Sequence, residues 1–182
     1  MQWFCPKQSS GARTATVAAA LGAVGVLSIS SAHAQAITSP KGYSIVPAHG
    51  WQNKPGTMGA DMFIFAKPAG GFSSNLNVVV TPTAPGDSLK KLPAQMAAAY
   101  PKMFTNYHSL GGKYLKVGGH DSYESSGTYE MGTPSRTLRL RQDFVIIGSK
   151  AYVVTCTAPN ASFATYTPAF NAMVKSMKFT GG

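Results

Sequence analysis

The sequence predicts an α+β domain in which an antiparallel β-sheet of about six to seven strands is flanked by helices, as an α/β/α sandwich. The longest β-type stretch, 136–158, carries β-branched and aromatic residues on both sides of a turn at Gly148 and Ser149. Shorter stretches of the same kind precede it at short intervals, which favours antiparallel pairing. Two other stretches repeat apolar residues every three or four positions, as helices that cover a sheet do.

The first 34 residues are predicted to be a secretory signal peptide that is cleaved. Lys7 and Arg13 precede the apolar stretch 14–29, and Ala32 and Ala34 then form a small-residue cleavage pattern. The apolar stretch is shorter than the roughly 20 residues that span a bilayer, and an uncleaved anchor is the alternative. We therefore expect one exported, periplasmic domain over residues 35–182.

The N-terminal half of this domain is predicted to contain three strands and one helix. The strands are expected at 43–46, 62–66 and 75–82, as neighbours in one sheet. The apolar spacing predicts a helix over 89–107, with Asp87 or Ser88 as its N-cap. Pro101 is expected to kink or interrupt this helix, because proline removes a backbone hydrogen bond.

The C-terminal half is predicted to contain four strands followed by a helix. The strands are expected at 113–117, 122–130, 136–147 and 150–158. Gly118 and Gly119 are expected to form the turn of the first hairpin, and 148–150 that of the second. The apolar spacing predicts a helix over 163–177, capped by Asn160 or Ser162.

The charge balance bears on the kind of partner. Without Lys7 and Arg13, 14 basic residues remain against 6 acidic residues, a net charge of +8. Such a charge favours nucleic acid, anionic lipid or an acidic protein. Export and the absence of a dense basic run argue against nucleic acid. We expect a monomer, without a membrane span after cleavage, that meets an acidic protein or membrane surface; a basic surface that serves only solubility is the alternative.

Arg136, Arg139 and Arg141 are the candidate partner-binding residues. On a strand, Arg139 and Arg141 project on one side, where guanidinium groups could hold acidic groups by forked hydrogen bonds. Asp143 lies on the same side and could pair with Arg141. An ordinary charged sheet face is therefore the alternative.

No catalytic, cofactor-binding or metal-binding residues are predicted, and we expect that the protein is not an enzyme. Cys156 is the only cysteine after the signal peptide, and we expect it to be a small buried residue rather than a nucleophile. His120 and Glu124 share one side of a strand, whereas Asp121 points to the other. Two ligands do not close a metal site, so a polar strand end is expected here.

Several short motifs resemble, in order and spacing, those of the PsbP-like family. GYSIVP at 42–47, followed by Trp51, resembles the family's opening, and NLNVVV at 75–80 resembles its next strand. KAYVV at 150–154 resembles the strand before the last helix, and MVKSMKF at 173–179 resembles the closing helix. The resemblance extends over 42–179.

This resemblance implies an antiparallel sheet between helices and an accessory binding role. Photosynthetic members dock on the lumenal side of photosystem II, in the oxygen-evolving complex, and the wider group includes a Ran-binding protein. It therefore implies an exported, non-catalytic protein that docks on a membrane-bound complex, in the periplasm or thylakoid lumen. The alternative is a periplasmic cell-envelope accessory or small-ligand-binding domain of the DcrB type. No cofactor is implied.

Overall fold

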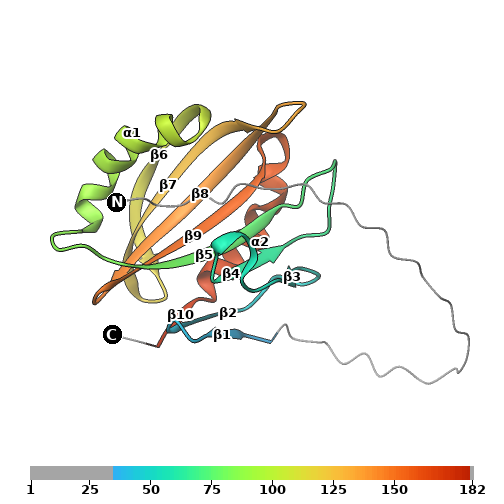
Figure 1. The fold of residues 1–182 in the computed structure, drawn as a ribbon. Helices are drawn as coiled ribbons and strands as arrows, with labels where there is room; N and C mark the ends of the chain where they lie inside the picture. Colours follow the sequence, from blue (N-terminus) through green and yellow to red (C-terminus); the bar gives the residue numbers. More distant parts are fainter. Residues whose placement is uncertain (1–34, 181–182) are drawn as a thin grey trace, which may run out of the picture.

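The computed structural model describes residues 35–180, and the predicted signal peptide lies outside them. Within this range the chain forms ten strands, two α-helices and three short 3₁₀ turns (Figure 1). The elements are β1 Ile37–Ser39, β2 Tyr43–Ile45, β3 Gln52–Asn53, η1 Thr57–Gly59, β4 Met62–Phe65, β5 Asn75–Pro82, η2 Leu89–Lys91, α1 Leu92–Met103, β6 Thr105–Val117, β7 His120–Met131, β8 Arg136–Ile147, β9 Lys150–Pro159, η3 Asn160–Ser162, α2 Phe163–Lys175 and β10 Lys178–Phe179.

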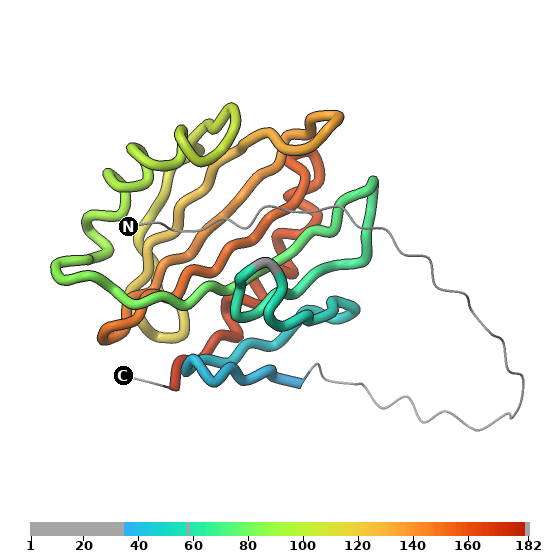
Figure 2. The backbone as a smooth tube through the Cα atoms, viewed as in Figure 1, coloured from blue at the N-terminus to red at the C-terminus, as the bar shows by residue number. Residues whose placement is uncertain are grey.

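Seven of these strands form one antiparallel sheet in the order β3-β4-β5-β9-β8-β7-β6, and β1, β2 and β10 form a second sheet. The four long strands β6 to β9 make consecutive hairpins, which are visible in the tube of Figure 2. Two of their turns lie at Gly118-Gly119 and Gly148-Ser149, as the sequence predicts, and the third, between β7 and β8, spans 132–135. The α+β prediction and the antiparallel pairing are confirmed.

The prediction that 43–46, 62–66 and 75–82 are neighbours in one sheet is wrong for the first of them. β4 and β5 do pair, but β2 pairs with β1 and β10. Phe179 of β10 lies opposite Tyr43 of β2. The two partners of β2, β1 and β10, are only three and two residues long, and they come from opposite ends of the described chain. No local sequence pattern therefore identifies this pairing.

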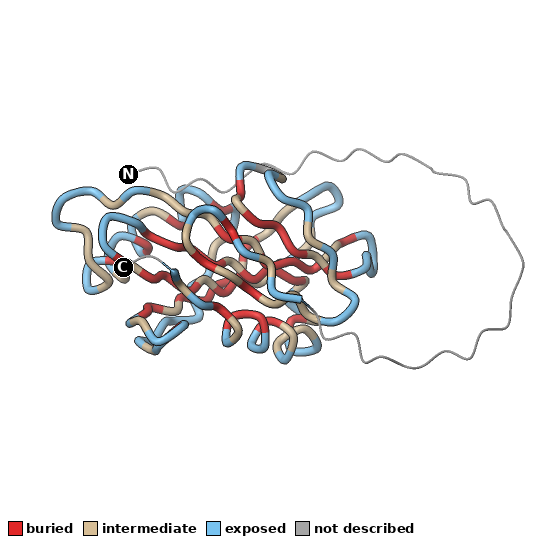
Figure 3. The backbone as a smooth tube through the Cα atoms, turned by 90° about the horizontal axis from the view of Figure 1, so that it is seen from below, coloured by how far each residue is buried: buried red, intermediate tan, exposed pale blue. Residues whose placement is uncertain are grey.

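The two helices cover opposite faces of the seven-stranded sheet. Phe170 and Met173 of α2 are buried against Tyr152 and Val154 of β9. Tyr100 of α1 belongs to a second core that includes the side chains of Leu92, Met96, Leu138, Leu140 and Phe144. Buried positions consequently run along the strands, whereas the turns are exposed (Figure 3).

The predicted helix over 89–107 is shorter than expected. Its first turn is the 3₁₀ turn η2, and α1 ends at Met103, two residues after Pro101. Tyr107 lies on β6, yet its ring centroid is 5.3 Å from that of Tyr100. The apolar residues at helical spacing therefore belong to one core, but they do not all lie on one continuous helix. Ser88 and Ser162 occupy N-cap positions of η2 and α2, but neither makes a side-chain capping hydrogen bond.

Candidate functional site

The three candidate arginines of β8 lie in different surroundings. Arg136 places its guanidinium 5.8 Å from the ring centroid of Phe72, and Arg139 places its own 4.7 Å from that of Phe163. Both are half-buried, whereas Arg141 is only 9% exposed. The structure therefore does not bring them together on one open ridge, and a docking role for them stays a prediction.

Arg141 belongs instead to a charge cluster, which we define as Lys113, Glu124, Arg141 and Asp143. The Nε atom of Arg141 lies 3.4 Å from Oδ2 of Asp143 and 3.8 Å from Oε2 of Glu124. Lys113 of β6 extends the cluster, with its Nζ 3.6 Å from Oε1 of Glu124. Arg141 also donates a hydrogen bond to Asn171 of α2. These contacts are the internal pairing that the sequence offers as the alternative to a partner site.

Asp143 is the most deeply buried charge of the cluster. It is 1% exposed, and neither carboxylate oxygen has a hydrogen-bond partner among the described residues. Loss of hydration outweighs the attraction of Arg141 and raises the pKa of Asp143 to about 6. Ionisation of Asp143 at neutral pH therefore lowers the stability of the folded state.

Cys156 lies on β9, opposite Arg141 in the register of the sheet. Its side chain is fully buried, as predicted. Burial raises the pKa of the thiol to about 12, even though Nη2 of Arg141 lies 3.8 Å from the sulfur. At neutral pH this cysteine is a protonated, enclosed thiol, which is a poor nucleophile.

His120, Asp121 and Glu124 do not converge. The ring of His120 lies edge-on to Phe179, with 5.4 Å between centroids. Asp121 accepts a hydrogen bond of 2.9 Å from Lys116, and Glu124 belongs to the charge cluster. Among residues 35–180 there is no group of three histidine, cysteine or acidic side chains that could hold a metal ion.

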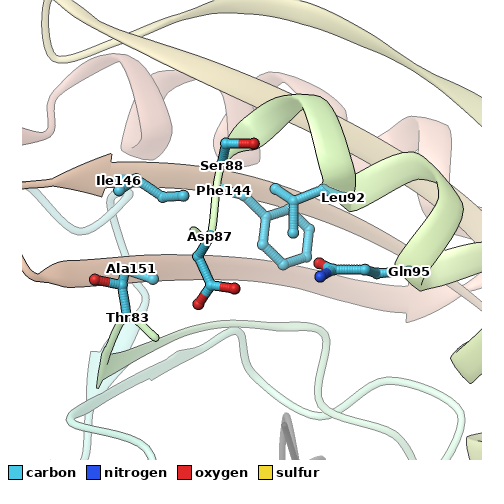
Figure 4. A pocket seen from close by; sticks show the side chains of 8 residues that line it. All are labelled: Thr83, Asp87, Ser88, Leu92, Gln95, Phe144, Ile146 and Ala151. Carbon is cyan, nitrogen blue, oxygen red and sulfur yellow. The ribbon is translucent and has the colours of Figure 1, made fainter. Parts of the chain in front are cut away.

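A small pocket opens between the start of α1 and the hairpin of β8 and β9 (Figure 4). It is lined by Thr83, Asp87, Ser88, Leu92, Gln95, Phe144, Ile146 and Ala151. The carboxylate of Asp87 accepts a hydrogen bond of 2.7 Å from the backbone N–H of Ala84, within the same loop. The pocket thus offers one carboxylate beside apolar side chains, with no second titratable group for acid–base chemistry.

The outer surface is strongly cationic. All eleven lysines from Lys41 to Lys178 are exposed, whereas Asp121 is the only exposed acidic residue in the described part of the chain. Three of the lysines, Lys41, Lys150 and Lys178, lie where β2, β9 and β10 meet, and we call them the lysine end. Nζ of Lys150 donates to the carbonyl of Lys41 at 3.2 Å, and Lys178 pairs with β2. Their separation in sequence hides this grouping from any local pattern.

Comparisons with known proteins agree with the predicted fold. The model of a family described as the serine/threonine kinase C-terminal domain matches residues 35–179. No curated protein matches the chain. A solved structure of LpqN, involved in cell envelope biogenesis of Mycobacterium tuberculosis, is 17% identical, with a TM-score of 0.59 over 76% of this chain and 83% of its own.

Two further structures have the same architecture. Cyanobacterial PsbP (CyanoP) from Synechocystis sp. PCC 6803 is 15% identical, with a TM-score of 0.58 over 87% of this chain and 98% of its own. The Ran-binding protein Mog1p of Saccharomyces cerevisiae is 8% identical, with a TM-score of 0.53 over 77% of this chain and 91% of its own. These likenesses confirm the PsbP-like fold, and identities this low show the fold alone. Among the described residues no helix has the length and apolar character needed to cross a bilayer.

Proposed function

The chain belongs to the serine/threonine kinase C-terminal domain family, and from this premise we propose that it is an exported, non-catalytic binding domain with a PsbP-like fold. It docks on the acidic protein surface of a membrane-bound complex. The observation that most directly supports this proposal is that residues 35–180 expose eleven lysines but a single acidic residue.

This contrast arises because the acidic side chains are largely engaged within the fold. Asp61 accepts a hydrogen bond of 2.8 Å from the hydroxyl of Tyr43, and Glu124 and Asp143 lie in the charge cluster. The lysines consequently face solvent with few counter-charges. Such a surface steers the protein toward an acidic partner and raises the association rate, an effect that salt screens over about 8 Å at physiological ionic strength.

Several features support a non-catalytic role. The thiol of Cys156 is enclosed, His120 is packed against Phe179, and Arg141 pairs with Glu124 and Asp143 within the fold. Gly118 and Gly119 form a hairpin turn rather than a phosphate-binding loop. None of these groups forms a nucleophile with an activating base.

The compartment is proposed from the N-terminal sequence. Its basic, apolar and small-residue order is that of an export signal. The similar fold of LpqN, which is involved in cell envelope biogenesis, favours a periplasmic accessory of the DcrB type as the second candidate. The similar fold of CyanoP is in keeping with docking on a photosystem II-type complex, in the thylakoid lumen if the source is photosynthetic.

Capture from detergent-solubilised membranes tests this proposal. We expect the purified protein to retain a specific complex at low salt and to release it at high salt. The variant with Lys41→Glu, Lys150→Glu and Lys178→Glu should lose most of the capture. A control with three lysines changed elsewhere, at positions 54, 67 and 102, has the same net charge and should retain more of it.

Two results would count against the proposal. If nothing is retained at either salt concentration, the cationic surface serves only solubility, and the pocket beside Leu92 becomes the place to search for a small ligand. If the two triple variants lose capture equally, net charge alone matters and the lysine end is not a docking site.

A further inference from the structure

One edge of the seven-stranded sheet is long and open. β6 is the last strand of the sheet and spans 13 residues, whereas the opposite edge, β3, has two. From Ser109 to Lys116 every residue except Leu115 is exposed. β6 is the outer strand beyond β7 (Figure 1). An edge strand of an antiparallel sheet directs alternate backbone N–H and C=O groups outward, so β6 presents a row of hydrogen-bonding groups without a strand partner.

Exposed apolar side chains gather at the same edge. The large hydrophobic residues that are exposed in the described part of the chain are Met103, at the end of α1, and Leu110 and Tyr114, on β6. Leu110 and Tyr114 are 52% and 59% exposed. Scattered exposed apolar residues need no explanation, but a set confined to one open edge marks an interaction surface.

The charge of β6 indicates which kind of strand would pair with this edge. The strand contains Lys113, Lys116 and His108 and no acidic residue. A second copy of this chain would place lysines opposite lysines, and lysines on an edge strand oppose such pairing. Lys113 and Lys116 pair with Glu124 and Asp121 of β7, but their side chains remain 67% and 68% exposed, so an acidic segment still meets complementary charge there.

We propose that β6 binds an extended segment of a partner protein as an additional strand, and that this segment alternates acidic and apolar residues. The register with β7 shifts between Ser109 and Gly111 and is regular from Gly111 to Val117. The added strand therefore pairs along 111–117. Because side chains alternate between the two faces of a strand, its acidic side chains lie on the face of Lys113 and its apolar side chains on the face of Tyr114. This inference rests on the proposed binding function but uses a surface on a different strand from the lysine end.

The test uses the full chain and two nine-residue peptides, one alternating glutamate and valine and the other alternating lysine and valine. Amide hydrogen exchange is followed by NMR with and without each peptide. We expect the glutamate peptide to slow exchange at outward-facing amides within 111–117, and the lysine peptide to have no effect. The variant Lys113→Ser with Lys116→Ser should bind the glutamate peptide about fivefold to tenfold more weakly at low salt.

A control with Lys54→Ser and Lys67→Ser carries the same charge change away from β6 and should bind the peptide almost as the unchanged protein does. If the glutamate peptide binds without protecting 111–117, or both double variants lose affinity equally, the strand-addition proposal is overturned while docking through the lysine end stands. If 111–117 becomes protected without peptide as the protein concentration rises, the occupant is a second copy and the acidic segment is wrong. Loss of membrane capture with intact peptide binding would overturn only the proposed function.

Discussion

Replacing Asp143 with asparagine is expected to stabilise the protein at neutral pH. Asp143 is buried, and its carboxylate has no hydrogen bond among the described residues. Its near neighbours with charge or a titratable group are Arg141, Glu124, Lys113 and Cys156. Arg141 retains Glu124 as a counter-charge in the variant, at 3.8 Å. The substitution therefore removes a poorly hydrated anion without leaving a cation unpaired.

The magnitude follows from the pKa of Asp143, which rises from 3.8 to about 6 because of burial. Each pKa unit corresponds to about 1.36 kcal/mol, so ionisation of Asp143 costs the folded state about 3 kcal/mol at pH 7. A carboxyl group whose pKa is raised on folding binds its proton more tightly in the folded state. The tighter proton binding of Asp143 in the folded state stabilises the protein fully below about pH 4, and this stabilisation is lost as the pH rises through 6.

Urea denaturation between pH 4 and pH 8, followed by circular dichroism, measures this effect. We expect Asp143→Asn to raise the free energy of unfolding by about 1 to 3 kcal/mol at pH 7, and the gain to vanish toward pH 4. The difference between the two proteins cancels the titration of all other groups that the substitution leaves unchanged. If the variant is less stable at pH 7 and the loss disappears on acidification, the attraction of Arg141 outweighs burial and the reasoning is refuted.

Two further predictions concern close packing and the thiol. Gly127→Ala should lower the free energy of unfolding, measured by urea denaturation, by about 2 kcal/mol, because a Cβ atom there would lie 2.5 Å from the ring of Tyr107. This loss of stability should be smaller when Tyr107 is also replaced by alanine. An equal loss in both backgrounds would show that the backbone at Gly127, and not the contact with Tyr107, is responsible. Cys156 should resist alkylation at pH 8 in the folded protein and react in urea, because burial raises its pKa to about 12; rapid reaction without denaturant, measured by mass spectrometry, would show that the thiol is accessible.

Local sequence patterns predict the parts of the fold that depend on near neighbours. The hairpins around Gly118-Gly119 and Gly148-Ser149 are such parts, because alternating residues and turn glycines lie together in the sequence. The faces of β8 were also predictable: Leu138 and Phe144 face α1, whereas Arg141 and Asp143 share the other face. A period of two fixes these directions without knowledge of the partner strands.

Features that depend on distant residues were not predictable. The sequence could not show that Arg141 would be covered by α2, whose Asn171 accepts its hydrogen bond, because burial depends on a helix thirty residues away. The predicted strand begins only at 113, and residues 105–107 are predicted to be helical, yet β6 begins at Thr105 because β7 and β8 provide a long template. The spacing of Tyr107 from Tyr100 predicts a helix, although the two rings pack together across α1 and β6.

The three-stranded sheet ties the beginning of the described chain to its end. Ser44 pairs with Lys178, and the N–H of Thr180 donates to the carbonyl of Gly42 at 3.0 Å. Nearly the whole domain lies inside the loop that these contacts close, so the conformational entropy of that loop must be lost before they form. Residues 178–180 therefore complete the fold by joining the two ends of the described chain. A growing chain cannot complete this sheet before Lys178 has emerged from the ribosome, and until then β2 lacks one of its two partner strands.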